Sequence, residues 1–241
     1  MDKHFAIAID TSGRVGSVAV GSGEKVICSS AFSGQMRHAA ELFPTILELV
    51  SGAGKNICDI TDVYVTNGPG SFTGLRIAIT VAKMMALASD VKIATVSSLD
   101  CVAMNAIDYI NEQNNKEIES VVALIDAKRG QFFNCLYNKE ENWDAVTPET
   151  MKTAEQILEM IGTTTKTLIN GEALKYYQDK FAQENVEFAD EERWGIKAEN
   201  VYKSAYKKAL KGQYDNPETL LPKYLRLSDA EENLLKRESK V

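Results

Sequence analysis

Three small polar residues follow the first apolar run of the chain, and their types and spacing could support chemistry. Asp10, Thr11 and Ser12 come directly after the run 5–9 and lead into a turn. A carboxylate that closes a strand beside hydroxyl groups can hold a metal-bound phosphate in a hairpin. An aspartate at this place is also a common turn former. The pattern predicts a weak cofactor-binding position at these three residues.

A second polar element is the glycine-rich segment 68–74, between a predicted strand and a predicted helix. Its glycines permit positive φ angles, Ser71 or Thr73 can cap the helix, and a helix N-terminus carries positive partial charge. The segment could therefore hold an anion through Gly68, Gly70, Ser71 and Thr73. It lacks a Walker lysine and the GxGxxG spacing, so a tight strand-to-helix connection explains it more simply.

Groups able to catalyse hydrolysis or bind a metal are sparse. The chain has two histidines, His4 and His38, which are too far apart in sequence to present two imidazoles from one helix. Ser71 has no GxSxG frame and could use only these two histidines as a base. The cysteines are widely spaced in apolar contexts and fit buried thiols. We predict no catalytic residue and no metal ligand in this chain.

These polar residues are positioned by a regular order of strands and helices. The pattern predicts strands over 5–9, 15–20 and 25–30, a helix over 37–50, a strand over 63–66, a helix over 73–89 and a strand over 91–95. A similar order returns as strands 121–125, 131–137 and 143–146, helix 153–161 capped by Thr153, strand 166–169 and helix 173–180. We interpret the recurrence as an internal duplication; chance similarity of two α/β halves is the alternative.

The order predicts an α/β protein with two tandem actin-like (ASKHA, RNase H-like) βββαβα subdomains. Residues 1–104 are assigned to the first subdomain and 105–212 to the second. The boundary is placed in the Asn- and Glu-rich stretch 105–120. Residues 213–241 form a C-terminal tail that is expected to pack back on the first subdomain.

The second half departs from what a phosphate site needs. Its first turn, 126–130, carries Lys128 and Arg129 where phosphate-binding hairpins have small residues. Its second turn, 170–173, lacks the paired glycines that pack against adenosine in actin-like ATPases. We therefore expect no ATP hydrolysis by the chain alone.

The helices predicted over 37–50 and 73–89 are apolar on more than one side, and Arg76 and Lys83 are the only charged residues of the second. A helix of this kind needs a sheet on one side and another surface on the other. We predict a partner chain there, and coverage by the second half is the alternative. A charge at Ala82 is expected to abolish pairing and to leave the fold largely intact. The predicted partner interface consists of Ala39, Leu42, Phe43, Ile46, Leu49, Gly74, Arg76, Ile77, Ala78, Val81, Ala82 and Met85.

Composition limits the class of partner. The chain has 241 residues, with 27 Lys and Arg against 34 Asp and Glu and a net charge of -7. A protein that binds polyanionic RNA by itself usually presents a basic field, so another chain should hold any RNA. We expect a cytoplasmic protein without a membrane contact, since the start lacks the features of a signal peptide and no apolar stretch is long enough to span.

Four segments resemble the TsaB (YeaZ) family: AIDTS at 8–12, NGPGSFTGLRI at 67–77, DAKRGQFF at 126–133 and PKYLR at 222–226. They cover nearly the whole chain in the order of the family, and GPGSFTGLR is highly specific to it and its close relatives. The resemblance implies a two-domain actin-like fold and an inactive relative of TsaD. Departures from the family pattern fall in the turn 12–14 and in the charged tail after Arg226.

The resemblance further implies a non-catalytic accessory subunit in the t6A modification of tRNA. TsaD would transfer threonylcarbamoyl to the adenosine next to the anticodon, while this chain binds TsaD as a heterodimer, acts with TsaE and meets tRNA only through the complex. A homodimer is implied when TsaD is absent, with pairing through the two apolar helices. TsaD-type relatives carry a His-x-x-x-His metal pair that 97–109 lack here. No cofactor is required by this chain, and any ATP or ADP would lie at the complex interface.

Two other functions stay open from the residues alone. Asp10 and the glycine-rich segment would suit a glycoprotease-type peptidase or an actin-fold ATPase or kinase that acts on its own. Turnover by the chain, abolished by Asp10→Ala, would favour that class. The apolar helices would also suit a domain that only self-associates.

Overall fold

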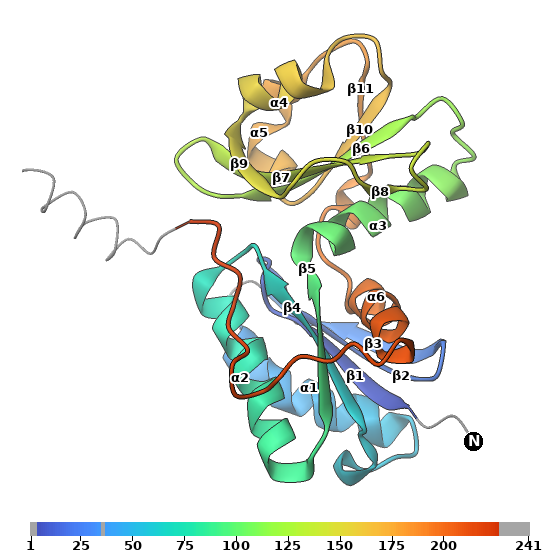
Figure 1. Cartoon of the computed structure of the whole chain (residues 1–241), viewed down its shortest axis with the longest axis vertical. Coiled ribbons are helices and arrows are strands. Elements are labelled where there is room, and N and C mark those ends of the chain that lie inside the picture. Colours follow the sequence, from blue (N-terminus) through green and yellow to red (C-terminus); the bar gives the residue numbers. More distant parts are fainter. Residues whose placement is uncertain (1–3, 35–36, 227–241) are drawn as a thin grey trace, which may run out of the picture.

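The structure, a computed structural model, describes residues 4–34 and 37–226 and consists of two lobes, each built on a mixed β-sheet (Figure 1). The first lobe contains β1 (Phe5–Asp10), β2 (Ser17–Ser22), β3 (Lys25–Ala31), α1 (His38–Gly52), β4 (Asp62–Gly68), α2 (Phe72–Ser89) and β5 (Lys92–Ser97). Its strand order is β3-β2-β1-β4-β5; β1 pairs with β2 and β2 with β3 antiparallel, and β4 is parallel to both β1 and β5.

The second lobe repeats this arrangement. It contains β6 (Ser120–Asp126), β7 (Gln131–Asn138), β8 (Asp144–Ala145), β9 (Thr150–Thr153), α4 (Ala154–Ile161), β10 (Thr167–Asn170), α5 (Leu174–Tyr177) and β11 (Val186–Phe188). Its order β11-β10-β6-β7-β8, read from the other end, matches that of the first lobe. The predicted repetition of three strands, helix, strand and helix is confirmed in both lobes. In the second lobe the third strand, β8, has only two residues, and β9 was not predicted.

Alternating side chains on the strands explain how helices cover both faces of the first sheet. Ile7 and Ile9 of β1 point to the face covered by α1 and α2, and they share a core with Leu42 of α1. Ala6 and Ala8 point to the other face, where small side chains leave room for a helix. That helix is α6 (Ala198–Leu210).

The two lobes are joined by a shared core. The helix α3 (Ser98–Glu112) leaves the first sheet and packs on β6 and β10 of the second, as Figure 1 shows. Val121 and Ala123 of β6 belong to the same buried cluster as Tyr64 of β4 and Tyr202 of α6. Apolar burial of this kind holds the lobes against each other.

The predicted division into 1–104, 105–212 and 213–241 stays a prediction. Two features bear on it: α3 covers the first part of the stretch assigned to the boundary, and α6, assigned to the second subdomain, packs on the first sheet. Residues 227–241 of the predicted tail lie outside the described residues.

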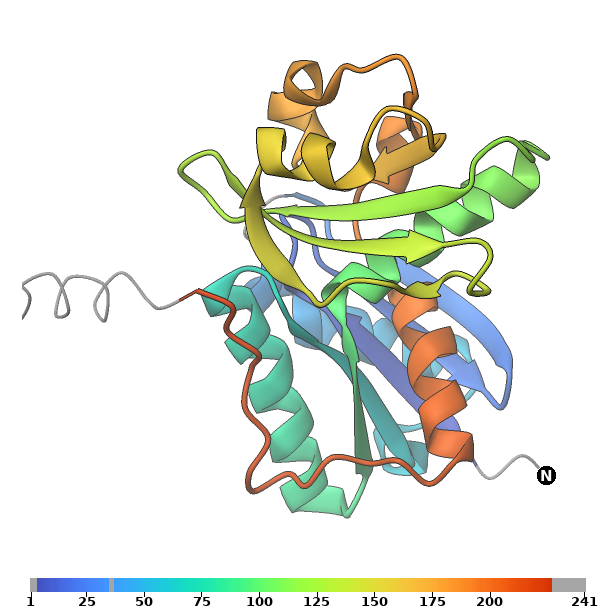
Figure 2. The ribbon, with the colours of Figure 1, turned by 45° about the horizontal axis from the view of Figure 1, so that its top comes forward.

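Residues 213–226, here called the C-terminal strap, run back along the first lobe beside α2 (Figure 2). The Asp215 amide donates to the Ile93 carbonyl oxygen over 2.8 Å, and the Lys223 amide donates to the Asn67 carbonyl oxygen over 2.7 Å. Leu220 is buried in the core beneath α2. The strap therefore covers one flank of α2 and ends at the junction of the lobes.

The apolar helix α2 has a defined place in this fold. Length and composition alone would let it cross a membrane, yet 33% of it is buried within the protein. Leu75, Ala78 and Ala82 are buried, and the helix packs on β4 and β5. The sheet thus explains the apolar character of its inner side.

Candidate functional site

A cleft of about 790 Å³ lies where the lobes meet, and motifs from both halves of the sequence line it. The predicted cofactor-binding residues Ser12, Gly70, Ser71 and Thr73 are among its lining residues. Asp10, Thr11 and Gly68 are not, although they lie in the same two segments. The structure thus brings the two predicted segments together and exposes part of them to the cleft.

Asp10 is enclosed at the end of β1. Its Oδ1 accepts hydrogen bonds from the Ser12 amide at 3.2 Å, the Ser12 hydroxyl at 2.6 Å and the Thr66 hydroxyl at 2.7 Å. Its Oδ2 is buried without a hydrogen-bond partner. Burial raises the pKa of the Asp10 carboxyl, against the hydrogen bonds from Ser12 and Thr66, which lower it. The end of β1 therefore holds a carboxyl group that is enclosed by the protein and has one oxygen without a partner.

The glycine-rich segment packs directly on the residues after β1. The Ser71 amide donates to the Ser12 carbonyl oxygen over 2.8 Å. A Cβ on Gly70 would lie 2.8 Å from Ser12 Cβ, and one on Gly74 would lie 1.8 Å from the Thr11 carbonyl oxygen. These glycines are required for close contact between two parts of the chain.

The helix cap and the remaining glycine also serve packing. Ser71 caps α2 by accepting from the Gly74 amide at 3.2 Å, whereas Thr73 is exposed and makes no such bond. Gly68 has φ of 120°, and a Cβ there would lie 2.6 Å from the carbonyl oxygen of Lys223 in the strap. These contacts explain the segment as a tight connection. A cofactor role for it stays a prediction.

The second lobe contributes a charged turn to the cleft. Asp126 accepts from the Lys128 amide at 2.8 Å and from the Lys128 ammonium at 3.1 Å. The Ala127 carbonyl accepts from the Arg226 guanidinium at 2.6 Å. The lining carries the cations Arg14, Lys128, Arg129, Lys223 and Arg226 against the anions Asp126 and Glu172. The cleft is therefore basic within an acidic chain.

Glu172 was missed as a site residue, because from the sequence it was only part of the turn 170–173, which lacks paired glycines. In the structure its Oε2 accepts from the Arg14 amide of the other lobe at 2.9 Å. Burial raises the pKa of the Glu172 carboxyl, and the hydrogen bond from Arg14 opposes this. A partner 158 positions away leaves no local sequence signal.

The predicted interface residues on α1 and α2 differ in their burial. Leu42, Ile46, Gly74, Ala78, Val81 and Ala82 are buried in their own lobe and cannot contact a partner in this conformation. Ala39, Phe43 and Arg76 are exposed, and Leu49, Ile77 and Met85 are half-buried. The periodicity could not show which stripe of two broadly apolar helices faces the sheet.

Four large apolar side chains of α1 and α2 are at least half exposed. Phe43 and Leu47 on α1 are 50% and 54% exposed, and Met84 and Leu87 on α2 are 59% and 90% exposed. Only Phe43 was in the predicted set. We call these four residues the outer apolar face.

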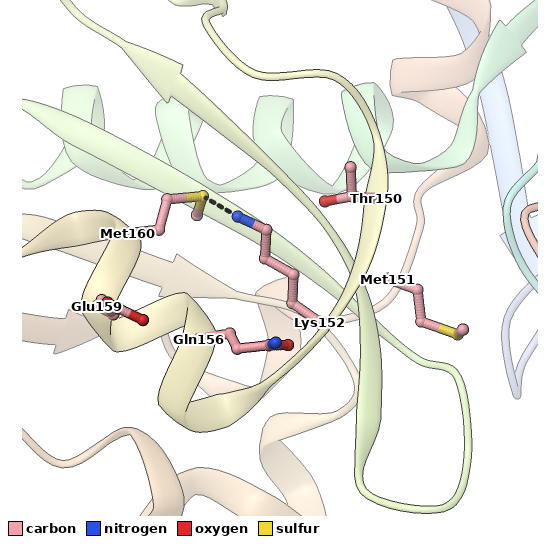
Figure 3. A pocket seen from close by; sticks show the side chains of 6 residues that line it. All are labelled: Thr150, Met151, Lys152, Gln156, Glu159 and Met160. Atoms are coloured by element: carbon pink, nitrogen blue, oxygen red, sulfur yellow. Dashed lines mark hydrogen bonds between the residues drawn. The ribbon is translucent and has the colours of Figure 1, made fainter.

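A second depression, of about 570 Å³, lies on the second lobe between β9 and α4 (Figure 3). Lys152 points toward Met160, with the ammonium 3.3 Å from the sulfur, while Met151 lies on the other side of the strand. Its lining includes none of the predicted site residues.

The two histidines lie in different surroundings: His4 pairs with Asp62 just before β1, and His38 lines the cleft. His4 Nδ1 lies 3.0 Å from Asp62 Oδ2, and the His38 ring packs against Phe32. Among residues 4–34 and 37–226, no group of three or more His, Cys, Asp or Glu side chains is arranged to hold a metal ion.

Comparison with known proteins gives a consistent result. Residues 32–234 match the family model described as TsaD: tRNA N6-adenosine threonylcarbamoyltransferase. The tRNA threonylcarbamoyladenosine biosynthesis protein TsaB of Bacillus subtilis (strain 168) is 29% identical over 157 residues, which are 64% of this chain and 65% of that protein. The protein of the same name from Escherichia coli (strain K12) is 29% identical over 136 residues, 56% of each chain. The match thus spans less than two thirds of either relative.

A solved structure extends the likeness to the fold. YeaZ from Pseudomonas aeruginosa superposes with a TM-score of 0.77 at 25% sequence identity, covering 92% of this chain and 100% of that one.

Proposed function

This chain belongs to the TsaD family of tRNA N6-adenosine threonylcarbamoyltransferases, and we propose that within this family it is a TsaB-like accessory subunit and not the transferase. The resemblance to TsaB (YeaZ) inferred from the sequence is confirmed by the relatives and by the YeaZ structure. The actin-like α/β fold is confirmed as well.

In this proposal the chain supports formation of threonylcarbamoyladenosine in tRNA by binding a TsaD partner in the cytoplasm. TsaD transfers the threonylcarbamoyl group, TsaE assists, and tRNA meets this chain only within the complex. The net charge of -7 supports leaving the RNA to another chain. The start of α3, where TsaD-type relatives carry paired histidines, contains none, which supports a non-catalytic role.

The outer apolar face is the main support for a partner-binding role. Large exposed apolar side chains that cluster on neighbouring elements are typical of protein interfaces. Lys83 is the only charged residue between Arg76 and Asp90, and its ammonium is turned to the Leu220 carbonyl oxygen of the strap at 3.2 Å. The outer side of α2 therefore presents apolar and small polar groups to a partner.

The same face would also carry the homodimer that we propose for the chain when TsaD is absent. A twofold dimer uses one patch on both subunits, so self-association and TsaD binding through this face exclude each other. Addition of TsaD should therefore convert the homodimer to a heterodimer.

Reconstitution tests the proposed role. The purified chain is mixed with TsaD and TsaE from the same organism, tRNA and the carbamoyl donor, and modified adenosine is measured by mass spectrometry of nucleosides. Modification is expected in the full mixture, none with this chain alone, and only background when this chain is left out. Equal modification with and without the chain, or product from the chain alone, would contradict the proposal.

A second candidate, an actin-fold ATPase or kinase acting alone, is favoured by the buried, unpartnered Oδ2 of Asp10 close to the cleft. It requires ATP turnover by the isolated chain that Asp10→Ala abolishes. The absence of turnover in the isolated chain would remove this candidate.

A further inference from the structure

The turn between β1 and β2 meets the turn after β10 across the cleft. Glu172 follows β10, and its carboxylate reaches into the other lobe to accept the Arg14 amide at 2.9 Å. A Cβ on Gly13 would lie 3.1 Å and 3.3 Å from the two carboxylate oxygens, and a Cβ on Gly195 would lie 3.3 Å from Oε1. Two glycines from different segments thus leave the space in which this carboxylate sits.

The Arg14 side chain does not form the contact with Glu172. Its Nη1 donates to the Tyr176 hydroxyl at 3.0 Å, its guanidinium lies 4.4 Å from the Tyr176 ring centroid, and its Nη2 lies 3.9 Å from Asp126 Oδ2. The carboxylate therefore meets the backbone of the β1–β2 turn, where a free amide would be a donor for any anion.

We propose that the β1–β2 turn is an anion-binding site whose resident anion is the carboxylate of Glu172, and that Glu172 keeps small phosphate anions out of the cleft. Two effects act together. The Arg14 amide is already bonded, and a second anion beside the carboxylate would meet like-charge repulsion.

The rest of the cleft favours anions. Its lining cations outnumber its lining anions, as described above. Without the negative charge of Glu172, the turn would offer a free amide within a basic cleft. This inference goes beyond the proposed function, because it concerns the cleft and not the outer apolar face.

The test uses the full chain with tripolyphosphate and inorganic phosphate as probes at pH 7.5, by isothermal titration calorimetry and amide NMR. Glu172→Ala frees the amide and removes the charge, and Glu172→Gln removes the charge but keeps an oxygen acceptor. Glu191→Gln is the matched control, because Glu191 lies in the same lobe and pairs at the surface with Lys175 at 2.9 Å.

We expect Glu172→Ala to bind tripolyphosphate at least about tenfold more tightly than the wild type, with shifts in the Gly13 and Arg14 amide resonances. Glu172→Gln should show a smaller gain at the same resonances, and Glu191→Gln should match the wild type. If Glu172→Ala is not folded, the Glu172→Gln result decides.

Three results would overturn the inference: wild-type binding as tight as in the variants, no gain in the folded variants, or a gain that leaves the Gly13 and Arg14 resonances unshifted. The probes need no TsaD. Failure here is therefore distinguishable from failure of the proposed partner binding.

Discussion

The hydroxyl of Thr11 donates a 2.6 Å hydrogen bond to the carbonyl oxygen of Gly74, a residue 63 positions away in the sequence. This bond joins the end of β1 to the first turn of α2. The two segments are so close that the Thr11 carbonyl oxygen lies where a Gly74 side chain would begin. The orientation of α2, and with it the outer apolar face, is therefore fixed by the glycine-rich segment.

Gly74→Ala should destabilise the protein by about 2 to 4 kcal/mol, because the added methyl group would force the two segments apart. In an open helical position the same change stabilises by up to about 1 kcal/mol. Gly52 of α1 is the matched control, since nothing lies within 4 Å of an added Cβ there. Urea unfolding followed by tryptophan fluorescence measures both, and equal effects of the two variants would contradict the packing account.

Ala82→Glu should unfold the first lobe or destabilise it by at least about 4 kcal/mol, because it places a charge in the core against the sheet. This corrects the expectation from the sequence that the fold would stay largely intact. Leu87→Glu on the same helix should change the free energy of unfolding by less than about 0.5 kcal/mol, because Leu87 is exposed. Circular dichroism on heating separates the two variants, and a stable, folded Ala82→Glu variant would contradict the burial of Ala82 against the sheet.

Ionisation of Asp10 should lower the free energy of unfolding as the pH rises. Its pKa is raised in the folded state, so between the unfolded value near 3.8 and the folded value the native state binds more protons than the unfolded state. Stability from this group is greatest below that window and falls as the pH rises through it. Asp10→Asn keeps an acceptor for Ser12 and Thr66 and cannot ionise.

The difference in unfolding free energy between Asp10→Asn and the wild type should therefore grow in favour of the variant as the pH increases from 4 to 8. Comparing the two proteins cancels the titration of the other carboxyl groups. A difference that does not change with pH would contradict the burial of an ionisable Asp10.

Thr153→Ala should cost about 1 kcal/mol through loss of the cap on α4. The Thr153 hydroxyl accepts from the Gln156 amide at 3.4 Å, and the Gln156 side chain accepts from the Thr153 amide at 3.0 Å. Thr153→Ser retains the hydroxyl and should leave the free energy of unfolding almost unchanged. Equal losses in the two variants would exclude the cap as the cause.

The cap of α4 also illustrates what could be predicted. A threonine followed three positions later by glutamine, ahead of an apolar helical pattern, specifies its helix end locally, and the structure agrees. Long apolar strands such as β1, and the helix α2, were predicted within one or two residues for the same reason. The repeated strand order followed from these elements.

Features that depend on distant contacts were not predicted. Asn105 was assigned to the boundary stretch without a structural role; it is buried within α3, where its amide donates to the Arg193 carbonyl oxygen at 3.1 Å. Glu172 has its partner in the other lobe. The buried positions of Ala82 and Leu42 depend on which side of each helix meets the sheet, and a helix that is apolar all round gives no periodic signal for that side.

Sedimentation velocity with purified TsaD measures whether the outer apolar face binds a TsaD partner. Leu47→Asp changes a residue of this face, and Leu210→Asp is the matched control, because Leu210 is exposed on α6 against the opposite side of the sheet. We expect the wild type and Leu210→Asp to form a heterodimer and Leu47→Asp to weaken it at least about tenfold without loss of fold. Unchanged binding by folded Leu47→Asp, or no binding by the wild type, would contradict the account.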